Sequence, residues 1–419
     1  MRITNLAREQ HGERSRVAAD VVWETIDRPT GRIHFETIEP FAPDLALDPH
    51  AFLLAAIVPA FRAGEARIAI DGAVCPRLRN GLETVMQVLA QWYDSVRTLP
   101  KIEPRDGFRP PMPCPRPRTG MFLSGGVDSL AMLRCNRLDY PMDNPGSVRD
   151  CFFVYGFDIG MPGAGDQTSF FEQARRSLLP IVQDAGADLI PVHTNLRILD
   201  PEGSAWPDEW FGIATASVAH AFSGRISSAL IAASLDIKGL VPVGSHPFLD
   251  QYFSSAGLQI IHDGAHMSRL QKIRLVADWA PALKSVRVCW AGVKVGGPLN
   301  CGQCRKCMRT MLGFLAIGKL DQAETFPVRQ ITPTMLHVIH IDNAHLLGFS
   351  NQLIENLRAI GRQDLADGLA KLNDAYVRRS RWEKDLGWRG ALRRFDKKYL
   401  GGCLIRASRV VDRLAGRSA

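Results

Sequence analysis

Hydrophobic residues in the middle of the chain fall into short apolar runs separated by longer amphipathic segments. The short runs have the length and composition of buried β-strands, and the segments between them have helical periodicity. The apolar runs are residues 120–123, 150–157, 189–193 and 240–244, and the helical segments are residues 129–135, 168–185 and 211–234. Strands that alternate with helices are typical of a parallel sheet covered on both faces. The pattern therefore predicts an α/β fold with a doubly wound parallel sheet.

The first hundred residues have a different pattern. Two β-branched and aromatic runs, residues 16–25 and 32–38, flank a turn that contains proline and glycine, which predicts a β-hairpin. The elements expected after it are helices at residues 49–63 and 75–93 and a short strand at residues 66–70. This mixture predicts a small N-terminal α+β domain over residues 1–98.

Proline marks the boundary between this unit and the α/β domain. Residues 99–119 hold seven prolines, which cannot continue a helix or a central strand, so we expect a linker there. The α/β domain is then expected over residues 120–318. From about residue 332 the pattern is purely helical, which predicts a helical C-terminal region over residues 319–419.

The composition belongs to an ordinary globular protein, with 46% hydrophobic and 22% charged residues in a chain of 419. The longest nearly uninterrupted apolar stretch, residues 52–61, has about half the length of a membrane-spanning helix. The first ten residues are polar, unlike a secretory signal. Nine cysteines, an odd number, suit a reducing compartment better than a disulfide framework. We therefore expect a cytoplasmic protein without a membrane span.

The net charge of +8 comes entirely from the C-terminal tail. Residues 377–419 hold 13 basic and 4 acidic side chains, so the rest of the chain carries a net charge of −1. Aromatic residues interleave with these charges, at Trp382, Trp388, Phe395 and Tyr399. RNA or an anionic membrane surface could bind such a segment. The alternative is a basic amphipathic helix that packs on the body of the protein. A homodimer is also compatible with the sequence.

The most informative stretch is a glycine turn between an apolar strand and an apolar helix. It reads Ser124-Gly125-Gly126-Val127-Asp128-Ser129. Such a turn presents backbone N–H groups and a helix N-terminus to an anion, and glycine lets a phosphate approach the backbone closely. The two serine hydroxyls add donors, whereas Asp128 suits Mg²⁺ or a cationic partner. Without a ligand, the same residues would form only a capped turn.

The whole string resembles the PP-loop of the N-type ATP pyrophosphatases, and it lacks the lysine of a Walker A loop. The resemblance implies an adenine-nucleotide α-hydrolase-like fold that binds ATP at the carboxyl end of its first strand. It also implies attack on the α-phosphate and release of pyrophosphate. The substrate then carries AMP on an oxygen, which a nitrogen or sulfur nucleophile displaces. Residues 124–129 would bind the nucleotide.

A second motif consists of closely spaced cysteines. Cys301, Cys304 and Cys307 form Cys-x2-Cys-x2-Cys, and Cys289 precedes them by eleven intervening residues. Four thiolates from one tight turn and one nearby strand end can enclose a tetrahedral metal ion. Zinc fits four cysteines, and an iron–sulfur cluster accepts the same spacing.

The wider context of these cysteines adds a second resemblance. Residues 267–275, residues 287–290, the cysteines and Arg309 resemble the C-terminal part of the 7-cyano-7-deazaguanine synthase family. This implies a structural zinc bound by the four cysteines. It also implies that Arg269 takes the place of a phosphate-binding lysine, with Lys272 as a second candidate. Together the two resemblances cover about residues 120–318.

Some polar residues depart from the family pattern or lie outside it. Asp158, in Phe157-Asp158-Ile159-Gly160, stands where the family has Asp-Tyr-Gly-Gln. Because it ends the second strand, it is a candidate for the ligand cleft as well as for a turn. Asp250 follows the fourth expected strand and is likewise a candidate for the ligand cleft or for a turn. His262, Asp263 and His266 are candidates for acid–base chemistry, for a second metal site or for ordinary loop positions.

These observations predict an ATP-dependent ligase that adenylates an acceptor and forms a carbon–nitrogen bond, with Asp128, Arg269 and Lys272 as catalytic candidates. ATP, Mg²⁺ and zinc are the expected cofactors, and the acceptor is not identified. One alternative is a sulfur-transferring enzyme that acts on tRNA or a metabolite. Another is a non-catalytic module that binds a nucleotide or RNA.

Overall fold

The structure, a computed structural model, describes residues 1–93, 97–111, 114, 117–289, 297–383, 392 and 395–396. The greater part of the basic tail, including Trp388 and Tyr399, lies outside the described residues. No helix within the described ranges is both long enough and apolar enough to cross a membrane.

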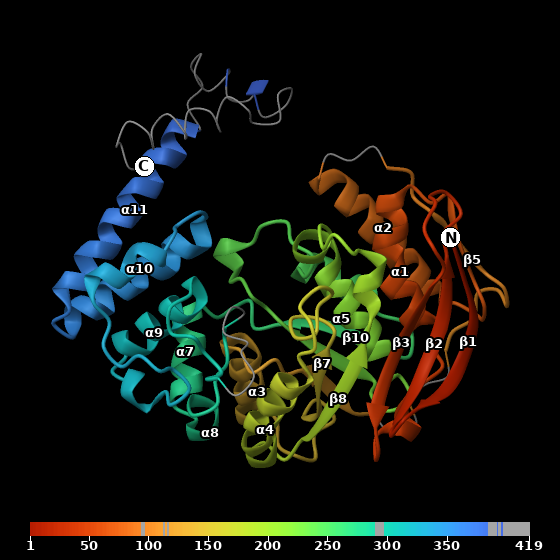
Figure 1. The fold of residues 1–419 in the computed structure, drawn as a ribbon, viewed down its shortest axis with the longest axis horizontal. Helices are drawn as coiled ribbons and strands as arrows, with labels where there is room; N and C mark the ends of the chain where they lie inside the picture. The colour runs from red at the N-terminus through yellow and green to blue at the C-terminus, as the bar shows by residue number, and fades with distance from the viewer. Residues whose placement is uncertain are drawn as a thin grey trace.

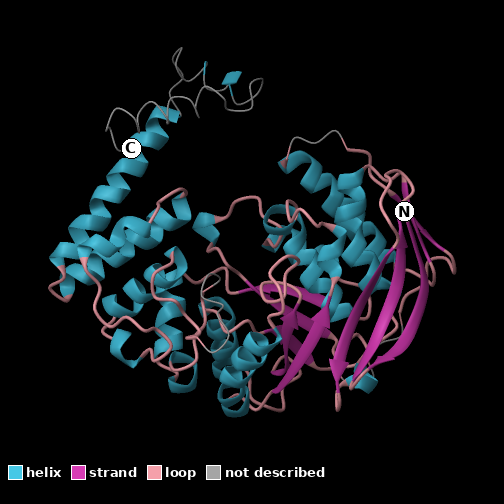
Figure 2. Cartoon of the chain, in the orientation of Figure 1, coloured by secondary structure: helices cyan, strands magenta, loops and turns pink. Residues whose placement is uncertain are grey.

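One mixed sheet runs through the described part of the molecule (Figures 1 and 2). Its order is β10-β9-β6-β7-β8-β3-β2-β1-β4-β5. The strands are β1 (Arg2–His11), β2 (Arg14–Val22), β3 (Gly31–Ile38), β4 (Arg67–Ile70), β5 (Lys101–Pro104), β6 (Thr119–Phe122), β7 (Val148–Tyr155), β8 (Asp188–Thr194), β9 (Ser228–Ala232) and β10 (Gln259–Asp263). Pairing is parallel from β10 to β8, antiparallel from β8 through β3 and β2 to β1, and parallel again to β4 and β5.

Helices cover both faces of the parallel strands. The α-helices are α1 (Pro49–Ala63), α2 (Pro76–Trp92), α3 (Val127–Asp139), α4 (Thr168–Asp184), α5 (Phe211–His220), α6 (Pro247–Asp250), α7 (Arg269–Ala277), α8 (Ala280–Leu283), α9 (Arg305–Ala316), α10 (Ala344–Ala359) and α11 (Gln363–Glu383). Successive side chains of β7 enter different cores, as a pleated strand requires. Phe152 packs in the core that contains α1 and α5, and Phe153 packs in the core of α3, α4, α7 and α9. The predicted α/β class is confirmed, although the sheet is mixed and only part of it is parallel.

The N-terminal strands extend the same sheet. The predicted hairpin forms between β2 and β3, with Val17 opposite Phe35. β3 then pairs antiparallel with β8, where Phe35 lies opposite Thr194. Helix α1 is buried along residues 50–61 and packs against α5. Residues 1–93 therefore share a sheet and a core with the parallel strands.

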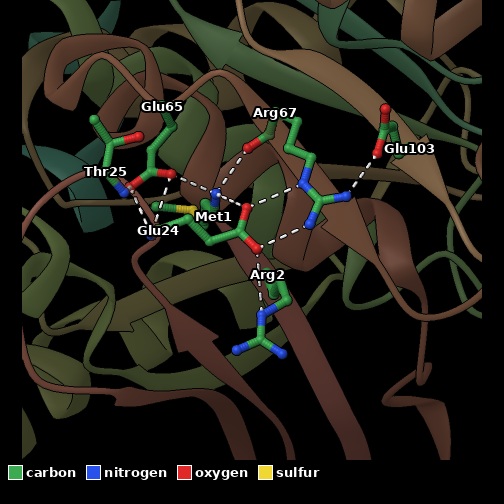
Figure 3. Close-up of polar contacts among 7 residues, drawn as sticks. All are labelled: Met1, Arg2, Glu24, Thr25, Glu65, Arg67 and Glu103. Atoms are coloured by element: carbon green, nitrogen blue, oxygen red, sulfur yellow. Dashed lines mark hydrogen bonds and ion pairs between the residues drawn. The ribbon is translucent and has the colours of Figure 1, made fainter.

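A polar network fastens the first strand to its neighbours (Figure 3). The amino group of Met1 is buried, forms ion pairs with Glu24 and Glu65, and donates to the carbonyl of Arg67. The guanidinium of Arg67 in turn pairs with Glu24 and with Glu103 of β5. These contacts join β1, β4 and β5 at one end of the sheet.

Two expected elements were wrong. The helix expected over residues 211–234 ends at His220, and β9 occupies its last part. A short apolar run fits a buried strand or a buried helix equally well, which explains this error. Residues 240–244 form no strand. They contain Pro242, which has no N–H to donate within a sheet. The strand that was missed is β10.

In the proline-rich segment and the C-terminal region, the structure differs less from what the sequence predicts. Strand β5 lies inside the segment expected as a linker, at the edge of the sheet, where Pro104 is tolerated. The described residues after 332 form a 3₁₀ turn followed by α10 and α11. Figure 1 shows these two helices at the opposite end of the molecule from the N-terminal strands.

Candidate functional site

The winding of the chain reverses between β6 and β9, which are neighbours in the sheet. The connections that follow β6 and β7 contain α3 and α4 and cover one face. The connections that follow β8 and β9 contain α5 and α6 and cover the other face. In doubly wound sheets, ligands bind at the carboxyl ends of the strands on either side of such a reversal. The glycine turn lies there, directly after β6.

The geometry of the turn suits a bound anion. Gly125 has φ +79°, a conformation that favours glycine, and Gly126 is the extended N-cap residue of α3. Because Gly126 has no side chain, none caps the first N–H groups of the helix. The Ser124 hydroxyl accepts from the N–H of Gly126 at 3.2 Å, and the Ser129 hydroxyl donates to its carbonyl at 3.1 Å. Within the described residues, the first N–H groups of α3 thus have no side-chain cap and could bind an anion.

The three catalytic candidates lie together beside this turn. Asp128 on α3 forms ion pairs with Arg269 at 2.6 Å and with Lys272 at 3.4 Å, both from α7. Lys272 is buried and also donates to the carbonyl of Ala233, directly after β9. Helix α7 begins with a capping box in which the side chains of Ser268 and Gln271 bind each other's backbone N–H groups. The cap fixes the first turn of α7, from which Arg269 and Lys272 extend.

These ion pairs determine the charge of Asp128. Burial is the largest single influence and would raise its pKa, but the charges of Arg269 and Lys272 outweigh that effect and lower the pKa. Burial likewise lowers the pKa of Lys272 and is opposed by the charge of Asp128. One carboxylate thus lies between two basic side chains in this cluster.

A buried arginine, Arg287, binds two carbonyl groups of the turn. The sequence suggested no role for it. The backbone N–H of Arg287 donates to the carbonyl of Gly125 at 2.8 Å, and its guanidinium donates to the carbonyl of Ser124 at 3.1 Å. Its side chain is 7% exposed, and its Nε has no partner within the described residues. Burial lowers the pKa of Arg287, and Asp158 partly opposes that effect. Its position two residues before Cys289 was the only signal that the sequence offered.

Two further cations lie on α9. Burial lowers the pKa of Lys306 to about 8, with Asp158 opposing the shift and Arg269 adding to it. Burial also lowers the pKa of Arg309 to about 10, and the charge of Arg269 contributes. The basic side chains in this part of the molecule are thus Arg269, Lys272, Arg287, Lys306 and Arg309, and the carboxylates that act on them include Asp128, Asp158, Asp236 and Asp342. Arg269, Lys272 and Arg287 contact residues of the turn itself, and such basic groups suit a polyphosphate.

The four predicted metal ligands converge into one cluster. Their sulfur atoms all lie within 4.8 Å of one another, with Cys289 3.8 Å from Cys304 and Cys301 3.9 Å from Cys307. Cys304 is the N-cap residue of α9, and its sulfur accepts from the N–H of Cys307. Such a group of thiolates could hold a metal ion or an iron–sulfur cluster.

Backbone N–H groups prepare part of this cluster for a metal. Burial is the largest influence on Cys301 and would raise its pKa. The N–H groups of Gln303 and Cys304 oppose it, and the pKa falls to about 7. Burial raises the pKa of Cys289 and of Cys307. A bound cation would supply the missing stabilisation of these two thiolates.

A second polar group lies near the carboxyl end of β10. The buried carboxylate of Asp250 accepts from Nδ1 of His262 at 2.8 Å, from the Ser245 hydroxyl at 2.8 Å and from the N–H of His246. A carboxylate that accepts from Nδ1 orients the imidazole and leaves Nε2 as an acceptor. The structure therefore brings together two residues that the sequence suggested only separately. His266, by contrast, is exposed.

Comparisons with known family models, with curated proteins and with solved structures found no match to this chain. The function proposed below therefore rests on the residues of the site and on the resemblance of its two motifs.

Proposed function

We propose that this protein is an ATP-dependent ligase of the PP-loop type, which adenylates an acceptor and releases pyrophosphate. The observation that carries the proposal is the glycine turn Ser124–Ser129, which lies where the winding reverses and is contacted by the cationic side chains of Arg269, Lys272 and Arg287. A turn of this kind without a ligand would not need so much buried positive charge, because each buried cation costs free energy.

Each group has a role in this proposal. The N–H groups of the turn and the hydroxyls of Ser124 and Ser129 would bind phosphate oxygens. Arg269 and Lys272 would stabilise the charge that develops on the departing pyrophosphate, which is the main electrostatic requirement of the reaction. Asp128 would hold these two cations in place before ATP arrives. Mg²⁺ bound with ATP would neutralise phosphate charge, and Asp128 and Asp158 are the candidate carboxylates for it.

The proposed reaction has two steps. A carboxylate oxygen of the acceptor attacks the α-phosphorus of ATP, so that an O–P bond forms and the bond to pyrophosphate breaks. A nitrogen nucleophile then attacks the activated carbon, loses a proton, and displaces AMP. The site supplies electrostatic stabilisation for the first step. A sulfur nucleophile in the second step would give the alternative, a sulfur-transferring enzyme.

We assign the cysteine cluster to a structural zinc. A tetrahedral zinc ion with Zn–S bonds of about 2.3 Å separates its sulfur ligands by about 3.8 Å, and the Cys289–Cys304 and Cys301–Cys307 sulfur distances are 3.8 and 3.9 Å. An iron–sulfur cluster distributes its four thiolates over two or four iron atoms and needs a wider arrangement. The donor spacing therefore favours a single ion.

Product analysis tests the proposed function. The full-length protein is incubated with ATP labelled at the α-phosphate, Mg²⁺ and the small-molecule fraction of a cell extract as the source of acceptor. We expect labelled AMP, and an equal amount of pyrophosphate in a parallel enzymatic assay. ADP and phosphate as the main products would contradict the proposal. A Ser124→Ala/Ser129→Ala variant serves as the control for contaminating ATPases, because it should lose AMP formation.

A further inference from the structure

Helix α9 belongs to both the cysteine cluster and the cationic site. Cys304 caps its N-terminus, Cys307 lies in its first turn, and Lys306 lies between them. A metal bound by these cysteines would therefore fix the position of the first turn of α9, and with it the direction in which Lys306 extends.

The packing of α9 on α7 indicates which groups lie in the direction in which Lys306 extends. Gly313 of α9 faces Ile273 of α7 so closely that an added Cβ would lie 2.4 Å from the Ile273 side chain. Lys306 and Arg309 precede Gly313 by seven and four residues, so they lie on the same face of α9. Arg269 precedes Ile273 by four residues on the corresponding face of α7. The two faces that meet at Gly313 and Ile273 thus continue into cationic side chains.

The adjacent arginine on α9 has a different environment. Arg305 is exposed and lies 3.4 Å from Asp342, which is exposed as well. Lys306 is half-buried, in the electrostatic field of Arg269, Asp128 and Asp158. Two neighbouring cations of the same turn therefore differ in their surroundings, which makes Arg305 a matched control for Lys306.

We propose that Lys306 binds the terminal phosphates of the nucleotide, and that metal in the cysteine cluster holds Lys306 in the position to do so. The metal would then control the affinity for polyphosphate as well as the fold of its own turn. The proposal rests on the proposed function in taking the site as one for ATP, but its test uses inorganic pyrophosphate and requires no turnover. The pyrophosphate experiment can therefore contradict this inference without contradicting the proposed ligase activity, and the ATP assay can contradict the ligase activity without contradicting this inference.

The first experiment measures pyrophosphate binding by isothermal titration calorimetry on the full-length, metal-loaded protein. Lys306→Gln should weaken binding about tenfold or more, because it removes one charge-assisted hydrogen bond. Arg305→Gln removes the same charge one residue away and should change the dissociation constant by less than about twofold. Equal affinities for the wild-type protein and Lys306→Gln would overturn the proposal, whatever the outcome of the ATP assay.

The second experiment tests the coupling to the metal. Removal of the metal with a chelator should weaken pyrophosphate binding in the wild-type protein to about the level of Lys306→Gln. It should cause little further loss in that variant, because both changes remove the same interaction. An undiminished affinity in the metal-free protein, with circular dichroism unchanged, would overturn the coupling.

A spectroscopic experiment tests the same link if the metal-free protein unfolds. With Co²⁺ in the cysteine site, pyrophosphate should perturb the visible cobalt bands of the wild-type protein and of Arg305→Gln. It should not perturb those of Lys306→Gln. An identical response in all three proteins would contradict the proposed link between the metal and Lys306.

Discussion

At the scale of single residues, the site is defined by charges that are buried before any ligand arrives. Lys272 is 2% exposed and Arg287 is 7% exposed, and each is held by a backbone carbonyl. Burial of this kind destabilises the fold unless a partner compensates for it. Asp128 supplies part of that compensation, and a bound polyphosphate would supply the rest.

The charge of Asp128 leads to a prediction about pH. Because its pKa is lowered in the folded protein, its contribution to stability is present above the unfolded value of about 3.9 and is lost as the pH falls through the folded value. Asp128→Asn should therefore unfold at a lower temperature than the wild-type protein near neutral pH. The difference should shrink in acid below about pH 4. Calorimetry between pH 3 and pH 7 measures it, and a gap that widens in acid would contradict the assignment.

The same substitution should affect turnover. Without the carboxylate, Arg269 and Lys272 lose the group that positions them, and AMP formation should fall by about a hundredfold or more. Asp278→Asn is a suitable control, since Asp278 follows the end of α7, away from the glycine turn.

Gly125 offers a second test at this scale. Gly125→Ala and Gly107→Ala both place alanine in a left-handed conformation, at φ +79° and φ +75°, so each should lose about 1–2 kcal/mol of stability. At Gly107 the added Cβ meets no atom within 4 Å, whereas at Gly125 it lies 3.1 Å from Leu178. Only Gly125→Ala should lose ATP binding, measured by equilibrium dialysis. If both variants lose ATP binding to the same extent, backbone strain alone accounts for the loss, and a role of the glycine turn in ATP binding is contradicted.

At the scale of elements, local patterns predicted those features that depend on adjacent residues. The strand–turn–helix around Gly125 and Gly126, and the convergence of the four cysteines, followed from spacing alone. Strand β9 did not, because a short apolar run does not distinguish a helix from a strand. The positions of Arg287 and Lys306 could not be predicted either. That of Arg287 depends on how the segment after α8 packs against the glycine turn, and that of Lys306 depends on where α9 packs against α7, at Gly313 and Ile273.

The cysteine cluster gives the prediction that belongs to this scale. Purified protein should be colourless and contain about one zinc ion per chain by elemental analysis. Cys304→Ser should lose the metal and unfold at a lower temperature, because the binding energy of a structural metal contributes to folding. Cys135→Ser, which changes a half-buried cysteine outside the cluster, should retain the zinc. A brown protein that contains iron and labile sulfide would show that the cysteines hold an iron–sulfur cluster and not zinc.

At the scale of the whole molecule, charge is divided unevenly between the body and the tail. The tail's excess of nine positive charges predicts that the full-length protein binds tRNA with an affinity that falls steeply as salt rises. Removal of residues 377–419 should abolish that binding and leave ATP affinity unchanged. Filter binding at several salt concentrations measures both quantities. Equal tRNA affinity in the full-length and truncated proteins would leave only the packed-helix interpretation of the tail.

The pairing of β3 with β8 has a consequence for how the protein loses its structure. Since the hairpin and the parallel strands share one ladder of hydrogen bonds and one core, heat should melt them as a single cooperative unit. Amides of β3 and β8 should exchange with deuterium at similar rates, and ATP should slow both, although the glycine turn lies at the end of β6. A fragment that starts at residue 120 would expose the edge of β8 and should aggregate. The N-terminal strands thus cover an edge of β8 that would otherwise be open to pairing with another chain.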